Sequence, residues 1–434
     1  MNYPAIDYVP AYPDVHTYAN LFGRMLTWEG DPWIEADLAR FESSYIHAGI
    51  SGFEHTFKGP DAQKLLSDAS INNVYKWKPG RCKHLVMLDE GGLVASHALF
   101  MRDDEETFRI TAGVEFPLVK LMQTGKYNVE MTTRDIFVFQ FSGPKSLTIL
   151  EKATQQDLRD VKFLDFRPVT IPGVDAEIEI CRIGMSGTLA YELRGAKADG
   201  PAVYDAVYQA GKPLGLKRLG WRGYHVNHTF GGFPQINCSF AMSIFRDPEF
   251  MKVALEQLAT SGSVEPENLR ARFRTPGETG WTWMAKLDHD FVGRAALEAE
   301  MAAPKRTVAS LLWNTEDIMD IYASQFREGE PYKYMEMPSG VQQPAGGHAD
   351  YVTTLDGKVI GYASDPAYCA YYRQTLSECA IDVDQAQVGN EVIIRWGDYG
   401  KKIKNVRAKV VRYPYIDLVK NEDYDLSTVP SGLD

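Results

Sequence analysis

The spacing of apolar residues repeats in two distant parts of the chain. The segments FKGPDAQKLLSDAS (57–70) and FSGPKSLTILEKAT (141–154) each read as a strand end, a Gly-Pro turn and a helix with apolar residues at helical spacing. In the first copy Pro60 suits an early helical position, where a missing backbone N–H does little harm, and Leu65 and Leu66 supply the buried stripe. The pattern predicts a duplicated architecture.

Each copy has a partner segment with the alternation of strands. Residues 83–101 and 176–195 contain alternating or apolar runs separated by Gly-rich turns, which predicts pairs of strands. Helical spacing returns at 201–212 and in the run 290–302. Strands and helices are thus mixed along the chain, and the pattern predicts an α+β fold.

The pattern changes after Pro304, where short strand-like runs bounded by Gly, Asp and Asn follow one another. These runs are TVASLLWN, YVTTLDGKVIGYAS, LSECAID, NEVIIRWGD and NVRAKVVRYPYI. We therefore predict two domains, a region of two related α+β subdomains at 1–303 and a separate antiparallel β-barrel or sandwich at 304–434. The long irregular connection 322–350 is of a length typical of functional loops.

Composition is that of a folded protein that binds a small molecule. The chain has 434 residues, 44% of them hydrophobic and 24% charged, enough for two or three packed units. A net charge of -12 without blocks of Lys or Arg argues against a nucleic acid partner. The N-terminal stretch lacks the pattern of a signal peptide, no run has the length of a membrane span, and the five cysteines lack CxxC spacing. We expect a cytoplasmic protein with reduced, mostly buried cysteines.

The segment RIGMSGTLAYELRG (182–195) sets a carboxylate, Glu192, within an apolar run after a Gly-rich turn. Two interpretations stay open for this side chain. It either faces water or pairs with Arg182 or Arg194, or it binds a flat ligand edge that carries an N–H and an amino group. The second arrangement would give two parallel charge-assisted hydrogen bonds, which are stronger and more specific than neutral ones.

This segment resembles the folate-binding segment of the glycine-cleavage T-protein superfamily, in which G-x-S/T-G precedes YEL. Further matches in the same order are the GPDA turn at 59–62, the GP turn at 143–144 and LDHDFVGRAAL at 287–297. The combination of KLDHDFVGRAALE, LLWNTED, PYKYMEMP and IIRWGD is similar to the tetrahydrofolate-dependent aryl O-demethylases of the vanillate and syringate type, which act in lignin catabolism. The resemblance implies a T-protein-like fold and tetrahydrofolate as the cofactor, with Glu192 holding its aminopyrimidinone edge.

The segment RGYHVNHTFGGF (222–233) corresponds to the R-x-Y-x-x-N-x-x-E-x-G-W segment of those demethylases, which places Tyr224 at their essential tyrosine. The chemistry supports this role independently, because transfer of a methyl group from an aryl ether leaves a phenolate that needs a hydrogen-bond donor. A tyrosine, with an ordinary pKa of about 10, is similar in acidity to a simple phenol. The alternative is a buried tyrosine whose hydroxyl only satisfies a backbone group.

The same resemblance implies further site residues. Asn227 is expected to orient Tyr224 or a substrate oxygen, unless it forms an Asx turn. Phe233 stands where the demethylases carry a tryptophan and either stacks on the pterin or packs in the core. Phe230 replaces an acidic residue, which predicts a more apolar pocket. The cofactor-binding residues expected in all are Glu192, Phe233, Tyr191, Ile110 and Gln140.

Two departures from the superfamily bear on the substrate. Its aminomethyltransferases place an aspartate after a Gly-Gly pair, whereas GGLVASH here supplies Ala95 and Ser96. This difference disfavours aminomethyl transfer and favours a neutral ether as the donor. The vanillate enzymes use an arginine to hold the substrate carboxylate, where this chain has Ala112. Since an arginine fork is the natural carboxylate clamp, its loss suggests a substrate without an aryl carboxylate or a clamp from elsewhere.

His225 and His228 form an HxxH pair, which together with His97 or His55 raises the question of a zinc site. A catalytic zinc site needs three protein ligands, and no HExxH or CxxC spacing supports one, so we expect no metal and histidines that hydrogen-bond in the pocket. The sequence also lacks the G-x-G-x-x-G, GxxxxGK[ST] and GxSxG motifs of nucleotide-binding proteins and hydrolases.

The sequence thus favours a metal-independent enzyme that moves the methyl group of an aromatic methyl ether to tetrahydrofolate, giving 5-methyltetrahydrofolate and a phenol or catechol. Tyr224 and Asn227 are the expected catalytic residues. One alternative is cleavage of a methylenedioxyphenyl group of a lignan-like substrate, with the bridging carbon passed to folate. Another is a folate-binding module without catalysis. The aromatic substrate, the oligomeric state and the roles of Ser51, His55 and Val114 stay open.

Overall fold

Both Gly-Pro turns lead from a strand into a helix in the computed structural model, which describes residues 15, 17–21, 24–48, 52–111, 114–236, 238–254, 258–339 and 347–433. The first turn joins β4 (Phe53–Lys58) to α2 (Ala62–Ala69), and the second joins β8 (Glu130–Ser142) to α4 (Ser146–Thr154). The predicted duplication is therefore confirmed.

A glycine is required at both turns. Gly59 has a φ of +151°, and a Cβ there would lie 2.2 Å from the Asn128 carbonyl oxygen. Gly143 has a φ of +133°, and a Cβ there would lie 2.6 Å from the Ser43 carbonyl oxygen. Only glycine adopts this backbone conformation and allows so close an approach of two backbone segments.

Strand β8 joins the two α+β halves into one ten-stranded sheet. Its first part pairs with β4, and its last part pairs with β11 (Ala190–Ala196). The order β5-β6-β7-β4-β8-β11-β10-β9 runs through both halves, and β3 and β12 pair beside β8. The other strands of this sheet are β3 (Ser44–His47), β5 (Arg81–Leu88), β6 (Val94–Arg102), β7 (Thr107–Thr111), β9 (Phe166–Ile171), β10 (Val174–Cys181) and β12 (Leu216–Leu219). Strands β1 (Thr17–Leu21) and β2 (Arg24–Glu29) form a separate two-stranded sheet.

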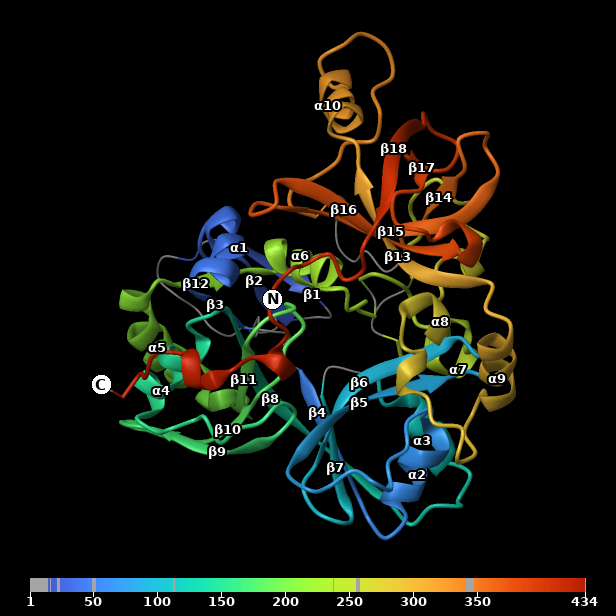
Figure 1. Cartoon of the computed structure of the whole chain (residues 1–434). Helices are drawn as coiled ribbons and strands as arrows, with labels where there is room; N and C mark the ends of the chain where they lie inside the picture. Colours follow the sequence, from blue (N-terminus) through green and yellow to red (C-terminus); the bar gives the residue numbers. More distant parts are fainter. Residues whose placement is uncertain are drawn as a thin grey trace, which may run out of the picture.

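Helices cover the two halves and connect them to the barrel (Figure 1). They are α1 (Trp33–Glu42), α3 (Phe116–Met122), α5 (Gly200–Gly211), α6 (Trp221–Gly231), α7 (Pro248–Met251), α8 (Pro276–Thr279), α9 (Arg294–Ala302) and α10 (Thr315–Ser324). Within the part of the chain that the structure describes, none of the helices combines the length and apolar character needed to cross a membrane.

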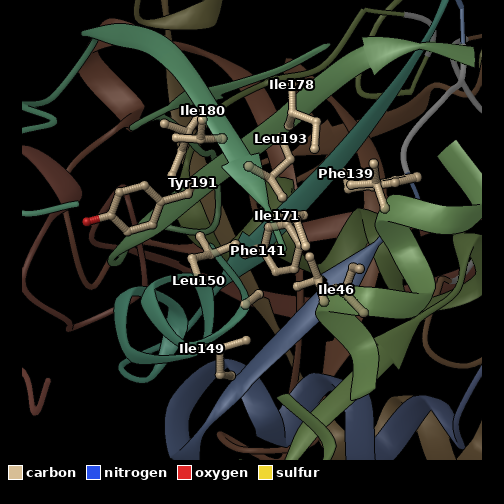
Figure 2. Packing of buried hydrophobic residues seen from close by; sticks show 14 of the residues in the cluster. Ile46, Phe139, Phe141, Ile149, Leu150, Ile171, Ile178, Ile180, Tyr191 and Leu193 are labelled. Atoms are coloured by element: carbon tan, nitrogen blue, oxygen red, sulfur yellow. The ribbon is translucent and has the colours of Figure 1, made fainter. Parts of the chain in front are cut away.

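Each half has its own core. In the second half, Phe139 and Phe141 of β8 and Ile149 and Leu150 of α4 pack with residues of β11 (Figure 2). Because side chains alternate along a strand, Tyr191 and Leu193 face this core and the residues between them face the other side of the sheet. That other side carries the site.

The C-terminal strands close into a barrel, which decides between the two predicted architectures. The strands are β13 (Arg306–Trp313), β14 (Asp350–Thr353), β15 (Val359–Cys369), β16 (Gln374–Asp382), β17 (Glu391–Trp396) and β18 (Lys404–Val411), and they close in the order β13-β16-β15-β14-β17-β18. The chain after the barrel returns to the second half, where Asn421 accepts a hydrogen bond from Arg182 at 3.1 Å. The barrel is therefore shorter than the predicted range 304–434.

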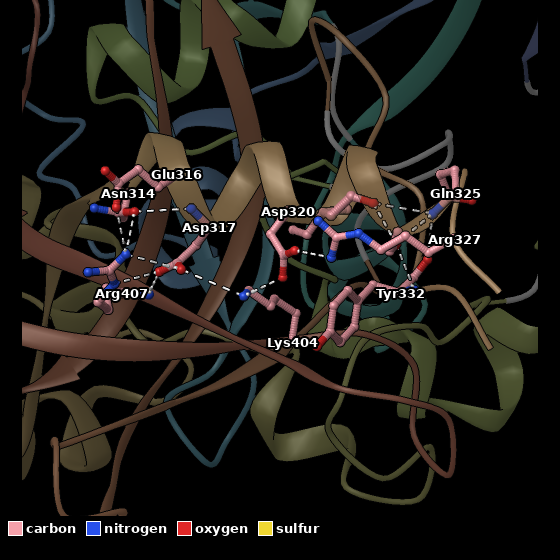
Figure 3. A network of polar contacts seen from close by, with 11 residues as sticks. Asn314, Glu316, Asp317, Asp320, Gln325, Arg327, Tyr332, Lys404 and Arg407 are labelled. Carbon is pink, nitrogen blue, oxygen red and sulfur yellow. Dashed lines mark hydrogen bonds and ion pairs between the residues drawn. The ribbon is translucent and has the colours of Figure 1, made fainter. Parts of the chain in front are cut away.

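Polar contacts with β18 hold α10 against the barrel (Figure 3), and its residues Ile318 and Ile321 pack with the barrel core. Asp317 accepts hydrogen bonds from the backbone N–H and the Nε of Arg407, both at 2.9 Å, and Asp320 accepts one from Lys404 at 2.9 Å. The Asn314 side chain caps the helix by accepting from the Asp317 N–H at 3.1 Å. These contacts fix the start of the long connection 322–350, of which residues 340–346 lie outside the described part.

Candidate active site

A cavity lies where the two halves of the sheet meet α6. The cavity has a volume of about 110 Å³, and its mouth opens to solvent. Its walls come from β5, β6, β7, β8, β11, α6 and the segments on either side. The lining residues are His84, His97, Ala98, Leu99, Thr111, Val138, Gln140, Ile183, Gly184, Met185, Glu192, Arg194, Tyr224, His228, Phe233, Pro234, Gln235 and Ile236.

Glu192 is a buried carboxylate in the cavity wall, with 6% of its surface exposed. One of its oxygens accepts a hydrogen bond from Gln140, its partner across β8 and β11, at 3.1 Å, and the other accepts one from Arg194 at 2.6 Å. The predicted pairing with Arg194 is confirmed. Arg182 instead bonds the C-terminal segment.

These contacts leave Glu192 able to bind a ligand. A carboxylate offers about four acceptor positions, and Gln140 and Arg194 use one on each oxygen. Burial disfavours the charge of Arg194, but the nearby groups Glu192, Cys82, Cys181 and Glu54 together hold the pKa of the guanidinium above its usual range. Each oxygen of Glu192 can therefore accept a further N–H, as an aminopyrimidinone edge requires.

Tyr224 lies on α6 with its ring close to parallel with two others. The ring centroids of His47 and Trp221 lie 4.4 Å and 4.9 Å from that of Tyr224, and 6.2 Å from each other. Burial raises the pKa of Tyr224 well above 10, with further contributions from Cys238, Tyr45 and Glu192. The hydroxyl is thus a weaker acid than the sequence suggested, and it stays protonated at neutral pH as a hydrogen-bond donor.

Asn227 supports the helix instead of the Tyr224 hydroxyl. Its amide nitrogen donates to the Tyr224 carbonyl oxygen at 3.1 Å, and its oxygen accepts from Arg40 at 2.9 Å. It is buried and does not line the cavity. The structure therefore places Asn227 behind the site, where it orients Tyr224 through the backbone.

For two of the expected cofactor-binding residues, the neighbour in the strand lines the cavity instead. Tyr191 belongs to the core of the second half and Ile110 to the core of the first, and neither lines the cavity. Their strand neighbours Glu192 and Thr111 line it instead. We correct the expectation for Tyr191 and Ile110 accordingly, because alternate residues of a strand face opposite sides of the sheet.

The two phenylalanines of the 222–233 segment lie on different sides of α6 and its C-terminal end. Phe233 lines the cavity, with its ring centroid 5.0 Å from His84 and 5.5 Å from His97. Phe230 is fully buried on the side of α6 that faces the barrel, where it stacks on Tyr372 at 5.8 Å. Phe230 thus does not make the pocket more apolar, which corrects that expectation.

The HxxH pair is divided between two environments. His225 faces Asp365 of β15 at 3.0 Å, whereas His228 lines the cavity and contacts the Phe233 carbonyl oxygen at 2.8 Å. In the described ranges no group of three or more His, Cys, Asp or Glu side chains is arranged to hold a metal ion.

His84 and His97 line the cavity; the sequence led us to expect His97 in the pocket but not His84. Their rings stack at 5.0 Å on β5 and β6. Burial lowers the pKa of His84 to about 4 and that of His97 well below its ordinary value, so both are neutral at pH 7. The alternation of side chains along β6, from Ala95 to His97, could have indicated which way His97 points. The pairing of β5 with β6, which brings His84 beside His97, cannot be read from the sequence.

The position at which the aminomethyltransferases of the superfamily carry an aspartate is apolar in this chain. Ala95 packs with Met242 and Ile244, and the Ser96 hydroxyl donates to the Val114 carbonyl oxygen at 2.8 Å. Neither side chain lines the cavity. Ala112 and Ser51 lie outside the described residues. His55 contacts Thr133 at 2.9 Å, away from the cavity.

Comparison with known proteins identifies the family. Residues 32–236 match the family model described as the GCVT N-terminal domain. The chain belongs to the glycine-cleavage T-protein (aminomethyltransferase) superfamily and, within it, to the tetrahydrofolate-dependent demethylase type. It is accordingly a tetrahydrofolate-dependent transferase.

The individual relatives span most of the chain. It is 34% identical over 417 residues to the sesamin methylene transferase of Sinomonas sp., covering 91% of each chain. It is 30% identical over 363 residues to the syringate O-demethylase of Sphingobium sp., covering 79% of this chain and 77% of that protein. The crystal structure of aminomethyltransferase T from Bartonella henselae superposes with a TM-score of 0.68 at 14% identity, over 94% of this chain and 95% of that one. The expected fold is confirmed.

The chemistry of the lining residues suits tetrahydrofolate. Glu192 offers two open acceptor positions to the pyrimidine edge, and Phe233 offers a ring face. Gln235 also lines the cavity, and its side-chain oxygen is buried without a hydrogen-bond partner among the described residues. A buried acceptor of this kind is satisfied when a ligand brings a donor.

Proposed function

We propose that this protein transfers the methyl group of a neutral aromatic methyl ether to tetrahydrofolate. The observation that carries the proposal is the convergence of Glu192 and Tyr224, from β11 and α6, on one cavity. One residue is suited to hold the pterin edge and the other to donate a hydrogen bond to the ether oxygen. We expect lignin-derived or related phenolic ethers as substrates, and a cytoplasmic location, since all five cysteines are free and buried.

The charge of the cavity supports an uncharged aromatic ring. Among the described lining residues Arg194 is the one guanidinium, and it is bound to Glu192 at 2.6 Å. Burial lowers the pKa of the lining residues His84 and His228 to about 4, so neither provides a cation at neutral pH. An aryl carboxylate would find no unengaged cation in this wall, whereas a methoxyarene would be accommodated.

The residues of the chain have defined tasks in such a reaction. Tetrahydrofolate supplies the nucleophilic nitrogen that accepts the carbon. Glu192, held by Gln140 and Arg194, fixes the pterin edge. Tyr224 donates its hydroxyl to the aryl oxygen as the carbon-oxygen bond breaks. Apolar residues such as Leu99 and Val138 exclude water, and much of the rate then comes from positioning, which is worth roughly 7–11 kcal/mol in favourable models.

A second candidate function is the opening of a methylenedioxyphenyl ring. The 34% identity to a sesamin methylene transferase over 91% of the chain favours it. The same pterin anchor and the same uncharged cavity would serve this reaction. The two candidates differ in the folate product, which is methyl-substituted in one case and methylene-substituted in the other.

A product assay tests both. Purified protein is incubated anaerobically with tetrahydrofolate and either guaiacol, vanillate, syringate or methylenedioxybenzene, and the folates are separated by liquid chromatography with mass detection. We expect 5-methyltetrahydrofolate from guaiacol, with slower turnover of the two carboxylates. A methylene folate from methylenedioxybenzene alone would establish the second candidate, and folate binding without any product would establish a non-catalytic module.

A further inference from the structure

The tautomer of His228, which lines the cavity, is fixed by a hydrogen bond. Its Nδ1 lies 2.8 Å from the Phe233 carbonyl oxygen. A carbonyl oxygen only accepts hydrogen bonds, so Nδ1 carries the hydrogen, and Nε2 of the neutral ring is left with a bare lone pair. Gly232, with a φ of +67°, turns the chain at the end of α6 and so brings the Phe233 carbonyl back to the ring.

The lone pair of Nε2 has no hydrogen-bond donor among the described residues. His228 is fully buried, lines the cavity and meets the ring of Tyr224 edge-on at 5.0 Å. Burial lowers its pKa to about 4, opposed by the bond to Phe233, and the charges of His225 and His47 lower it further while that of Asp365 raises it. His97 faces it across the cavity. The ring is thus a neutral acceptor at neutral pH, beside the proposed hydrogen-bond donor.

The proposed transfer needs such an acceptor. When the methyl carbon bonds to an N–H nitrogen of tetrahydrofolate, that nitrogen has one proton in excess, and the electron pair of the broken carbon-oxygen bond leaves the aryl oxygen one proton short. Tyr224 supplies a proton at the oxygen. A base is required at the nitrogen, and afterwards Tyr224 must be protonated again.

We propose that His228 is the catalytic base that takes the proton from the folate nitrogen through Nε2. The inference rests on the proposed function. In the balanced reaction the nitrogen-carbon bond forms, the carbon-oxygen bond breaks, and the folate proton goes to His228. The Tyr224 proton goes to the aryl oxygen, and His228 returns its proton to Tyr224. Nothing is oxidised or reduced.

The other buried histidines serve this role less well. His47 has the same tautomer, with Nδ1 2.9 Å from the Leu219 carbonyl oxygen, but it lines a separate small cavity behind Tyr224. His84 and His97 stack on each other, and no backbone carbonyl fixes their tautomer among the described contacts. His225 is bound to Asp365.

The substitution His228→Asn tests the assignment, because the asparagine amide retains a donor near the Nδ1 position and removes the Nε2 base. We expect kcat to fall at least 100-fold, while calorimetric affinity for tetrahydrofolate stays within threefold and the melting temperature stays close to that of the wild type. His47→Asn is the matched control, because His47 is also buried, also has Nδ1 next to a backbone carbonyl oxygen and also contacts the Tyr224 ring, which it stacks on whereas His228 meets it edge-on. It should lower kcat much less than His228→Asn does.

Two readouts are independent of the turnover number. In nitrogen NMR spectra of the folate-free protein, Nε2 of His228 should have the shift of an unprotonated ring nitrogen from pH 8 down to about pH 5. In a His228→Ala variant, added imidazole should restore turnover, whereas it should not restore any activity lost in His47→Ala, since that site lies outside the cavity.

The outcomes separate this inference from the function on which it rests. Full activity of His228→Asn alongside an active wild type would overturn the role of His228 alone. A loss of folate affinity as large as the loss of kcat would also overturn it, by showing a binding role. If the wild type forms no folate product with any ether, the proposed function fails and the inference fails with it.

Discussion

The two faces of α6 carry similar residues in different environments. The face toward the cavity carries Tyr224 and His228, and the face toward the barrel carries His225 and Phe230. His225 and His228 are both fully buried, yet burial without a carboxylate partner lowers the pKa of His228 to about 4. For His225 burial also disfavours the charge, but Cys238 and Asp365 outweigh it and raise the pKa well above its ordinary value.

The difference teaches that burial alone does not set the charge of a histidine. The partner of His225 is built into the barrel, where Asp365 adopts a φ of +51° at an irregularity of β15 and also accepts from Ser239 at 3.2 Å. The barrel face of α6 thus makes an ionic and apolar contact with the barrel, whereas His228 on the cavity face is neutral.

Substitution of Tyr224 should give the largest effect on activity. Tyr224→Phe keeps the ring contacts with His47 and Trp221 but removes the hydroxyl donor. We expect kcat to fall by roughly 100- to 10,000-fold, the usual range for loss of an acid-base group, with folate affinity nearly unchanged. Single-turnover kinetics and calorimetry measure the two quantities. Full activity in this variant would remove Tyr224 from the reaction.

Substitution of Asp365 should act on stability. Asp365→Asn leaves His225 buried without its carboxylate, and breaking a buried pair costs about 3–5 kcal/mol. Because the folded pKa of His225 is raised, its contribution is complete below about pH 6.5 and is lost as the pH rises through the folded value. The lowered pKa of Asp365 adds a contribution that is present above about pH 3.8 and is lost at lower pH.

The destabilisation by Asp365→Asn should therefore be greatest near pH 5–6 and smaller at pH 8.5. Urea unfolding of both proteins at the two pH values gives the difference in free energy. An equal difference at both would show that His225 is not charged in the folded protein. In the pH 5–6 range the folded fraction of the variant should retain most of its transfer rate.

Phe230→Leu should have the smallest effect. Phe230 packs against Val226 and Tyr372 and does not line the cavity. An apolar replacement of similar volume costs about 1.5 kcal/mol or less, with kcat unchanged. Thermal unfolding measures the stability, and the transfer assay measures kcat. A marked loss of kcat without a loss of stability would mean that the barrel face also takes part in the reaction.

The sequence predicted the elements whose signals are local. The glycines at 59 and 143 mark both copies of the repeated turn, because their backbone conformation excludes other residues. Glu192, Gln140, Tyr224 and Phe233 were expected at one site, and the structure brings all four to one cavity.

What the sequence did not predict depends on register and on long-range pairing. For Tyr191 and Ile110 the prediction was off by one residue. The alternation of side chains shows that a strand has two faces, but it does not show which face lines the cavity. His84 reaches the site only through the pairing of β5 with β6. The side of α6 that holds Phe230 is likewise set by the closed barrel, whose contact with α6 no local pattern describes.

The anchoring of folate by Glu192 is the central claim, and anaerobic calorimetric titration with tetrahydrofolate tests it most directly. The wild type should bind one equivalent, and Glu192→Gln, which exchanges one carboxylate oxygen for an amide donor, should weaken binding by at least 1.4 kcal/mol, or about tenfold. Phe230→Leu, away from the cavity, should bind like the wild type. Equal affinity in wild type and Glu192→Gln would contradict the account.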